Sequence, residues 1–227
     1  VLTEEGFVND YPLELILMNA EEGATFGPST GVSNSRAMLG TMTQRELETV
    51  KNRFGQTKLE AMAEYGLKPD LKAAIRKPGS IKNFLELHIE QGPVLERENI
   101  EIGLIRYLAG IGRYTIRFHG ATADSTVPMD SRKDALVAAA SFDRQIKALG
   151  PDVTGMVGKL DVTPNSNQFV PEYVEGKIEI RTFSRECIEK TNFKELITAI
   201  LNVVSAEYGI RTELEEITRI NYPNPTG

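Results

Sequence analysis

The chain has 227 residues, of which 41% are hydrophobic and 26% are charged, and its formal net charge is −6. These proportions are ordinary for a soluble globular protein, and the length allows one large domain or two small ones. A negative charge without a run of Lys and Arg argues against nucleic acid as a partner. No apolar run approaches the roughly 20 residues of a membrane helix, so no membrane partner is expected.

The first half of the chain is predicted to alternate strands and helices. Residues 13–20 are nearly all apolar, as in a strand buried on both faces of a sheet. A second buried strand is predicted at 84–90. Polar residues follow both segments, at the kind of strand end where ligands gather in open α/β sheets. Between them, Gly and Pro residues separate the helices predicted at 44–53, 58–65 and 69–75.

From about Gly110 the predicted elements follow a different order. Residues 113–119 alternate like a strand, and residues 130–149 have the apolar spacing of an amphipathic helix. The remaining elements are a strand, a strand, a helix and a strand, at 153–162, 173–183, 192–208 and 211–217. This β-α-β-β-α-β order is that of a ferredoxin-like sandwich. The predicted fold class is therefore α/β, with a partial α/β domain at 1–109, a small complete domain at 110–220 and a linker at 221–227.

The two ends of the sequence and its cysteine content indicate the extent of the natural protein and its cellular location. The sequence begins with Val1 and closes on a segment rich in Asn and Pro, so we expect the natural protein to extend beyond both ends. Cys187 is the single cysteine, which excludes an internal disulfide bond. With no visible signal peptide, a reducing cytoplasm is the expected location. Cys187 has no histidine nearby in sequence and is interpreted as a structural thiol.

Three residues next to the predicted strands are candidates for metal chemistry. Glu21 and Glu22 directly follow the first apolar segment, where one carboxylate could bind a metal ion while the other takes a proton from water. Most Glu-Glu pairs are solvated turn residues, and that alternative stays open. His88 lies in the second apolar segment, where a neutral imidazole suits zinc. A core histidine bonded to a backbone carbonyl is the commoner situation for a lone histidine.

Two other side chains in the second half give weaker indications. His119 closes a predicted strand and is interpreted as an ordinary surface or turn histidine. Arg181 is expected on an inner strand of the second domain. A buried guanidinium there needs an anionic partner, which would be a structural acid or a substrate carboxylate.

Three segments carry a resemblance to a known family. They are N-A-E-E-G-A-T-F-G at 19–27, E-L-H-I-E-Q-G-P-V-L-E at 86–96 and P-M-D-S-R-K-D-A at 128–135. The first is similar to N-E-E-G-x-R-F-G of the M20-type amidases, which include N-carbamoyl-L-amino acid hydrolases, allantoate amidohydrolases and β-ureidopropionases. The second agrees closely with the same family's motif, and the third with the start of its lid-domain helix. The resemblance covers essentially the whole chain.

The resemblance implies a fold and an activity. It implies a zinc-exopeptidase-like α/β/α catalytic domain, here partial, and a ferredoxin-like lid domain through which family members form homodimers. The complete enzyme would use two zinc or manganese ions. It would hydrolyse the carbamoyl or ureido C–N bond of an N-carbamoyl amino acid or an allantoate-like substrate.

The resemblance also assigns roles to residues of this chain. Glu21 would be the general base, while Glu22 and His88 would each bind one of the two metal ions. The substrate would be contacted by four further side chains, Gln91 in the pocket and Arg181, Gln168 and Asn167 from the lid.

Departures from the family pattern limit what this chain is expected to do alone. The family's remaining metal ligands belong to segments before Val1 and after Gly227. Its lid motif A-x-H-A-G-T-T-P-M appears at 121–129 as A-T-A-D-S-T-V-P-M, without histidine. We therefore expect this chain alone to be inactive and to hold only part of the metal centre of a longer parent enzyme. The alternative is a catalytically degenerate module of the same family that dimerises or binds a ligand.

Overall fold

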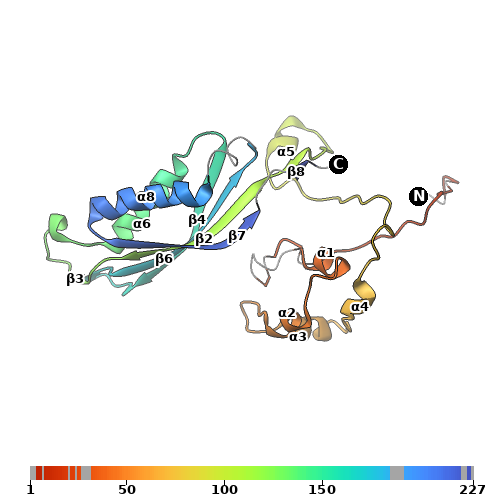
Figure 1. Ribbon diagram of the computed structural model, residues 1–227, viewed down its shortest axis with the longest axis horizontal. Coiled ribbons are helices and arrows are strands. Elements are labelled where there is room, and N and C mark those ends of the chain that lie inside the picture. Colours follow the sequence, from red (N-terminus) through yellow and green to blue (C-terminus); the bar gives the residue numbers. More distant parts are fainter. Residues whose placement is uncertain are drawn as a thin grey trace. The chain divides into compact units, whose positions relative to one another are not determined.

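The structure is a computed structural model that describes residues 4–6, 8–19, 21–23, 25–26, 32–184, 192–220 and 224–225. It divides into two compact units, Val1–Ile89 and Glu90–Gly227, each treated by itself below. Figure 1 labels the helices and strands of both. Cys187 lies outside the described residues, and the domain boundary expected near residue 110 stays a prediction. None of the described helices is long and apolar enough to cross a membrane.

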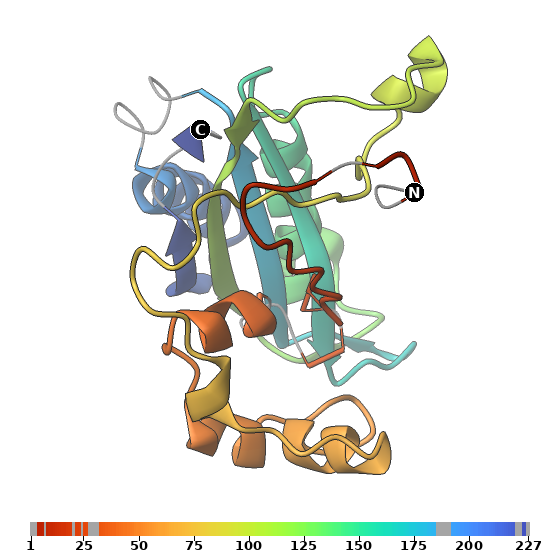
Figure 2. The same cartoon turned by 90° about the vertical axis from the view of Figure 1, so that its right-hand side faces the viewer.

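Four short helices make up the regular structure described in unit 1. The side chains of Thr43, Thr57 and Asp70 accept hydrogen bonds from backbone N–H groups in the first turns of three of them, which satisfies donors that a helix start leaves unpaired. Helices α2 and α3 lie side by side, orange in Figure 2. The helices predicted at 44–53, 58–65 and 69–75 are confirmed in place but are shorter. The bounds are α1 (Ser33–Met38), α2 (Gln44–Thr49), α3 (Lys58–Glu64) and α4 (Leu71–Ala74).

The two buried strands predicted at 13–20 and 84–90 are wrong for this structure. The described residues of both segments belong to no strand, and Leu15 and Leu87 are 90% and 94% exposed. Their apolar pattern suits a buried strand, but a strand also needs a hydrogen-bonded neighbour. The described part of unit 1 supplies no strand that pairs with either segment.

An ion cluster centred on Glu46 joins the first three helices. Arg36 of α1 donates from Nη1 to Oε1 of Glu46 at 2.9 Å and from Nη2 to Oε2 at 2.7 Å. Lys58 of α3, which is only 6% exposed, donates from Nζ to Glu46 Oε1 at 3.0 Å and to Ser33 Oγ at 2.8 Å. Hydrogen bonding from Arg36, followed by the contact with Lys58, lowers the pKa of Glu46 below its ordinary 4.5. A nearly buried ammonium therefore depends on this carboxylate for its counter-charge.

Glu46→Gln should destabilise unit 1 by about 1–3 kcal/mol, between the values typical of exposed and of buried ion pairs. Because the folded-state pKa of Glu46 is lowered, its stabilisation is present above pH 4.5 and is lost as pH falls through the lower folded value. Urea unfolding of both proteins between pH 7 and pH 3 measures this. Glu48→Gln, at an exposed position of the same helix, is the control. Equal stability of the two variants at pH 7 would contradict the prediction.

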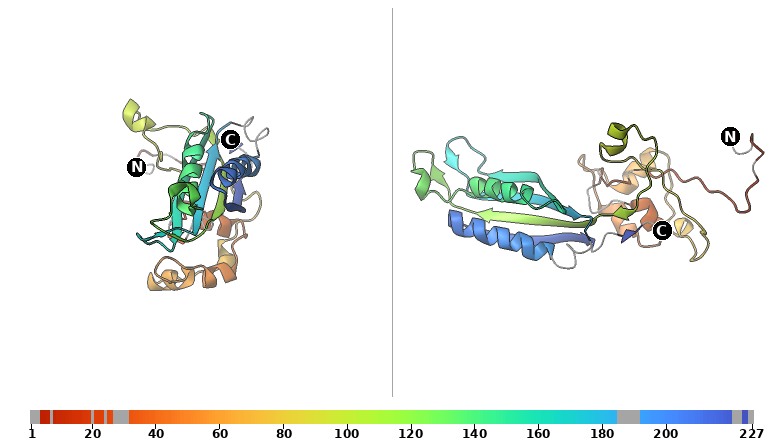
Figure 3. Two further views of the ribbon diagram at one scale, coloured as in Figure 1. Left: turned by 90° about the vertical axis from the view of Figure 1, so that its left-hand side faces the viewer. Right: turned by 90° about the horizontal axis from the view of Figure 1, so that it is seen from above.

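The described part of unit 2 is built around a four-stranded antiparallel sheet and its two longest helices, α6 and α8. The strand order is β4-β6-β2-β7, and the chain order is the predicted β-α-β-β-α-β. Figures 1 and 3 show α6 and α8 against one face of the sheet. The predicted helix at 130–149 starts later, since Asp134 caps α6 by accepting from two backbone N–H groups. The bounds are β2 (Gly110–His119), α6 (Ala135–Lys147), β4 (Val153–Thr163), β6 (Tyr173–Thr182), α8 (Phe193–Tyr208) and β7 (Arg211–Ile220).

Short elements complete unit 2. Strand β1 (Tyr107–Leu108) pairs with β8 (Asn224–Pro225), and β3 (Ala123–Asp124) pairs with β5 (Phe169–Val170). Helix α5 (Val94–Glu98) precedes β1, and the 3-10 helix η2 (Met129–Ser131) precedes α6.

The core of unit 2 lies between the sheet and the helices. Tyr114, Ile116 and Phe118 of β2 point to this side and are at most 1% exposed. The Phe118 ring meets the edge of Phe142 from α6 with centroids 5.8 Å apart. Each such side chain contributes about 1.5–3 kcal/mol by burial, so the β2 row stabilises the fold more than any surface contact.

The end of β2 is held by a backbone contact that only glycine permits. A Cβ atom on Gly120 would lie 2.1 Å from the Lys133 carbonyl oxygen. Ala121 N–H donates to the same carbonyl at 2.9 Å, and Gly120 N–H donates to Glu172 O at 2.7 Å. Gly120 therefore ties the end of the central strand to the loop that leads into α6.

Gly120→Ala should destabilise unit 2 by at least about 1–3 kcal/mol, because the backbone must move apart to admit the methyl group. Gly150→Ala is the matched control, since no heavy atom lies within 4 Å of the position of its Cβ. Urea unfolding followed by circular dichroism measures both. A Gly120→Ala protein as stable as the Gly150→Ala protein would contradict the contact.

Candidate metal site

Unit 1 brings together the three residues that the sequence singled out for metal chemistry. His88 Nε2 lies 3.0 Å from Glu22 Oε1 and 3.5 Å from Glu21 Oε2. One nitrogen and two carboxylate oxygens thus fall within 4.8 Å of one another. In the part of the chain that the structure describes, no other group of three His, Cys, Asp or Glu residues has this spacing. The His88, Glu21 and Glu22 side chains are 27%, 23% and 47% exposed, so a solute can reach them.

The backbone around the two glutamates shapes this arrangement. Val32 N–H donates to the Glu21 carbonyl at 2.8 Å. Gly23, which is buried, has a φ of 71°, in the left-handed region that glycine enters without strain. The chain therefore turns sharply directly after the carboxylates.

The contact made by the other ring nitrogen of His88, Nδ1, determines which nitrogen of the neutral ring carries the proton. His88 Nδ1 lies 2.7 Å from the Ile89 carbonyl oxygen, which can only accept a hydrogen bond. Nδ1 therefore holds a proton, and in the neutral ring the lone pair is on Nε2, the atom that faces the carboxylates. A metal-binding histidine in proteins commonly donates its second N–H in this way. Imidazole and carboxylate oxygens are also ligands that zinc accepts, so the residues present fit a divalent metal ion.

The same contacts make His88 a stronger base. The Ile89 carbonyl first, and then the carboxylates of Glu21 and Glu22, raise the pKa of His88 above its ordinary 6.5. The protonated ring is thus the favoured metal-free state at mildly acidic pH. A metal ion must displace this proton to reach Nε2.

Zinc binding to this chain should therefore weaken as pH falls through the raised pKa of His88, and strengthen above it. Titration calorimetry with zinc between pH 5.5 and 8.5 measures the dependence. His88→Ala should lower the affinity at least tenfold at pH 8. His119→Ala is the control, because His119 belongs to unit 2 and is the only other histidine of the chain. Equal affinities for both variants would exclude His88 as a ligand.

Gln91 and its neighbour Glu90 adopt a local structure of their own. Gln91 is exposed and has a left-handed φ of 57°. The Glu90 carboxylate accepts from Val94 N–H and Leu95 N–H, each at 2.9 Å, and so caps α5. The proposed pocket role of Gln91 stays a prediction.

The sequence predicted a buried Arg181, and the structure shows that this prediction is wrong. Arg181 lies on the inner strand β6, but its side chain is 44% exposed and its Nε donates to Glu179 Oε1 at 2.6 Å. The reason is the alternation of β6, in which Ile180 and Thr182 fill the core side while Arg181 points to the open face. Its anionic partner in the structure is a structural acid.

Asn167 and Gln168 lie in an exposed loop between β4 and β5. Gln168 O accepts from Ser125 N–H at 3.0 Å. In the β4–β6 ladder Thr163 pairs with Tyr173 next to this loop, whereas Arg181 pairs with Thr154 at the other end. At about 3.3 Å per residue, Tyr173 and Arg181 are roughly 26 Å apart. The structure therefore does not bring Arg181 and Gln168 together.

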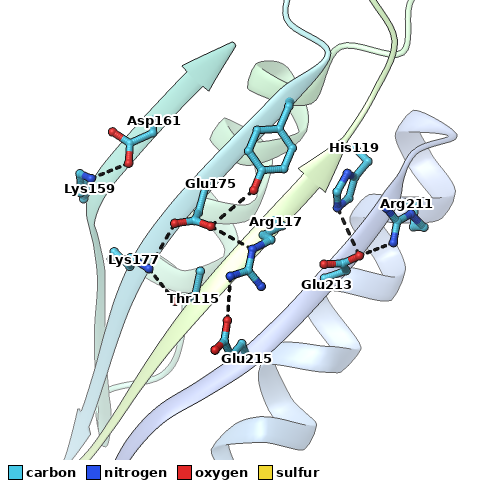
Figure 4. Close-up of polar contacts among 11 residues, drawn as sticks. Thr115, Arg117, His119, Lys159, Asp161, Glu175, Lys177, Arg211, Glu213 and Glu215 are labelled. Carbon is cyan, nitrogen blue, oxygen red and sulfur yellow. Dashed lines mark hydrogen bonds and ion pairs between the residues drawn. The ribbon is translucent and has the colours of Figure 1, made fainter.

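The open face of the sheet carries a network that the sequence did not predict. Figure 4 shows Arg117 between Glu175 and Glu215, with Nε and Nη2 donating at 2.9 and 2.7 Å. His119 lies 3.4 Å from Glu213, which also pairs with Arg211. Alternating charges along three strands were visible in the sequence, but the partners became definite only with the register of the strands.

The comparisons with known proteins show the family to which the chain is related. No established family profile matches the chain. N-carbamoyl-L-amino-acid amidohydrolases of Paenarthrobacter aurescens and Geobacillus stearothermophilus are 33% and 34% identical over 97% and 95% of it. A hydantoinase/carbamoylase family amidase from Burkholderia multivorans superposes over 99% of the chain with a TM-score of 0.73 and 26% identity. The chain is a homologue of the carbamoylase-type amidohydrolases.

The chain spans about half the length of the relatives that it matches. It covers 54% and 53% of the two N-carbamoyl-L-amino-acid amidohydrolases and 54% of the Burkholderia multivorans structure. An allantoate amidohydrolase of Bacillus subtilis, 29% identical, is matched over 50% of its length.

Proposed function

We propose that this chain is part of a metal-dependent amidohydrolase that cleaves a carbamoyl or ureido C–N bond in an N-carbamoyl amino acid or allantoate-like substrate. The observation that carries the proposal is the convergence of Glu21, Glu22 and His88, with His88 Nε2 facing both carboxylates. The relatives named N-carbamoyl-L-amino-acid and allantoate amidohydrolases support the reaction class. We expect the chain by itself to be inactive.

Each of the three residues has its own role in this proposal. Glu22 and His88 would each hold one of two divalent ions, zinc or manganese. Such ions, when bound, polarise a carbonyl and make water more acidic. Glu21 is the less exposed of the two glutamates, at 23% against 47%. Its carboxylate would accept a proton from the attacking water and later pass it to the leaving nitrogen.

The substrate contacts would come mainly from unit 2. Its strand order and chain order support a ferredoxin-like lid domain at 110–220. Arg181 would bind the substrate carboxylate and Gln91 would line the pocket. The amides of Asn167 and Gln168 would bind the ureido group.

The separation of these residues favours a homodimer. Arg181 and the loop with Gln168 lie at opposite ends of β6, too far apart for one small substrate to touch both within one copy. Two copies associated through the lid would let one supply the arginine and the other the amides. We propose a cytoplasmic location for the parent protein, since Cys187 has no partner for a disulfide bond within this chain.

A catalytically degenerate module is the second candidate function. Residues 121–129 contain no histidine, whereas the resembling lid motif does. A hydrogen-bond donor to a developing oxyanion is worth about 10²–10³ in rate, so its loss would matter. This candidate predicts a dimer that binds ureido ligands without cleaving them.

The full-length gene product should retain about two divalent metal ions and release ammonia from N-carbamoyl-L-amino acids or allantoate. Glu21→Gln should lower kcat by about 10²–10⁴ while metal content is unchanged, because it removes only the proton acceptor. Metal analysis and an ammonia assay on the same samples measure both. Glu48→Gln is the matched control. A full-length protein that keeps its metal and is inert would favour the degenerate module, and one without metal would overturn both the site and the reaction.

A further inference from the structure

The loop between β2 and α6 is held by strand pairing and by hydrogen bonds within a tight turn. Strand β3 of this loop pairs with β5, with Ala123 opposite Val170. Asp124 Oδ1 accepts from Thr126 N–H at 3.0 Å and from Thr126 Oγ1 at 2.8 Å. Val127 N–H donates to Asp124 O at 3.0 Å and closes a tight turn over residues 124–127.

Arg132 binds this turn through two hydrogen bonds. Its Nε donates to Val127 O at 2.8 Å and its Nη2 donates to Ser125 O at 2.7 Å. Both acceptors are backbone carbonyls. The planar guanidinium can therefore fix two peptide groups of the turn at once, in a geometry that the single ammonium of lysine does not reproduce.

The 124–127 turn is also hydrogen-bonded to Gln168, a proposed substrate-binding residue. Ser125 N–H donates to Gln168 O at 3.0 Å, so Ser125 is bound by Arg132 through its carbonyl and by Gln168 through its amide. Gln168 is exposed, and within its own loop its N–H donates to Ser166 Oγ at 3.2 Å. The contacts with Ser125 and Ser166 thus both hold the Gln168 backbone in place.

We propose that Arg132 is a positioning residue that sets the Ser125–Val127 turn and, through Ser125, the placement of Gln168. The part of this inference that concerns the substrate rests on the proposed function. The part that concerns the loop rests on the hydrogen bonds alone. Arg132 thus acts from a distance on ligand binding, without touching the ligand.

The first measurement follows the loop in this chain. Amide hydrogen exchange by NMR should show Ser125 exchanging at least tenfold faster in Arg132→Ala, because its backbone is then held from one side only. Arg132→Lys should lie between, since one ammonium can replace one of the two donors. Amides of the β2 core, such as Ile116 and Phe118, should keep their wild-type rates. Arg144→Ala, at an exposed position of α6, is the matched control and should change none of them.

The second measurement uses the full-length gene product with N-carbamoyl-L-alanine. Arg132→Ala should raise KM at least fivefold and change kcat less than twofold, as expected when a ground-state contact is misplaced. The KM of Arg132→Lys should lie between those of the wild type and Arg132→Ala. A fall in kcat with KM unchanged would overturn the positioning role.

The two measurements fail in different ways. Unchanged Ser125 exchange in Arg132→Ala, or faster exchange throughout β2, would overturn the inference whatever the enzyme does. Faster exchange confined to the turn, with a wild-type enzyme that cleaves no ureido substrate, would support the loop assignment and overturn the proposed function.

Discussion

The pairing of β2 on both of its edges constrains the whole of unit 2. Residues 110–119 pair with β6 on one side and residues 111–119 pair with β7 on the other, so each side chain of β2 is assigned to one face of the sheet. Tyr114, Ile116 and Phe118 fill the core under the helices. A shift of one residue would exchange the two faces and bury Arg113 and Arg117 without partners.

The register of the strands also determines which charged side chains pair on the open face of the sheet. Thr115 points to this face and is fully buried, and Lys177 Nζ donates to its hydroxyl at 2.8 Å. Glu179 similarly accepts from Arg113 and Arg181, each at 2.6 Å. Individually such exposed pairs stabilise little. Together they set side-chain positions, including that of Arg181.

In the candidate metal site of unit 1, the His88 ring is oriented by a contact between residues adjacent in the sequence. The Ile89 carbonyl belongs to the residue next to His88, so the ring orientation is set within two residues of chain. The glutamates are likewise set by a local turn at Gly23. Local contacts of this kind orient the His88 ring and the two glutamates, although the described segments that carry them form no sheet. A bound metal ion would order these side chains further.

Much of this protein can be predicted from its sequence. Apolar periodicity determined the strands and helices of unit 2, since each element needs one apolar face against one core. Local chemistry marked Glu21, Glu22 and His88, and the motif at 86–96 indicated the amidohydrolase relationship. The tertiary structure alone decided three other matters. The segments at 13–20 and 84–90 are not strands, because a strand needs a partner that periodicity does not reveal. Arg181 is exposed and paired, because the register of β6 assigns it to the open face. Arg132 binds carbonyls of a turn, because hydrogen-bond acceptors in the backbone have no signature in the sequence.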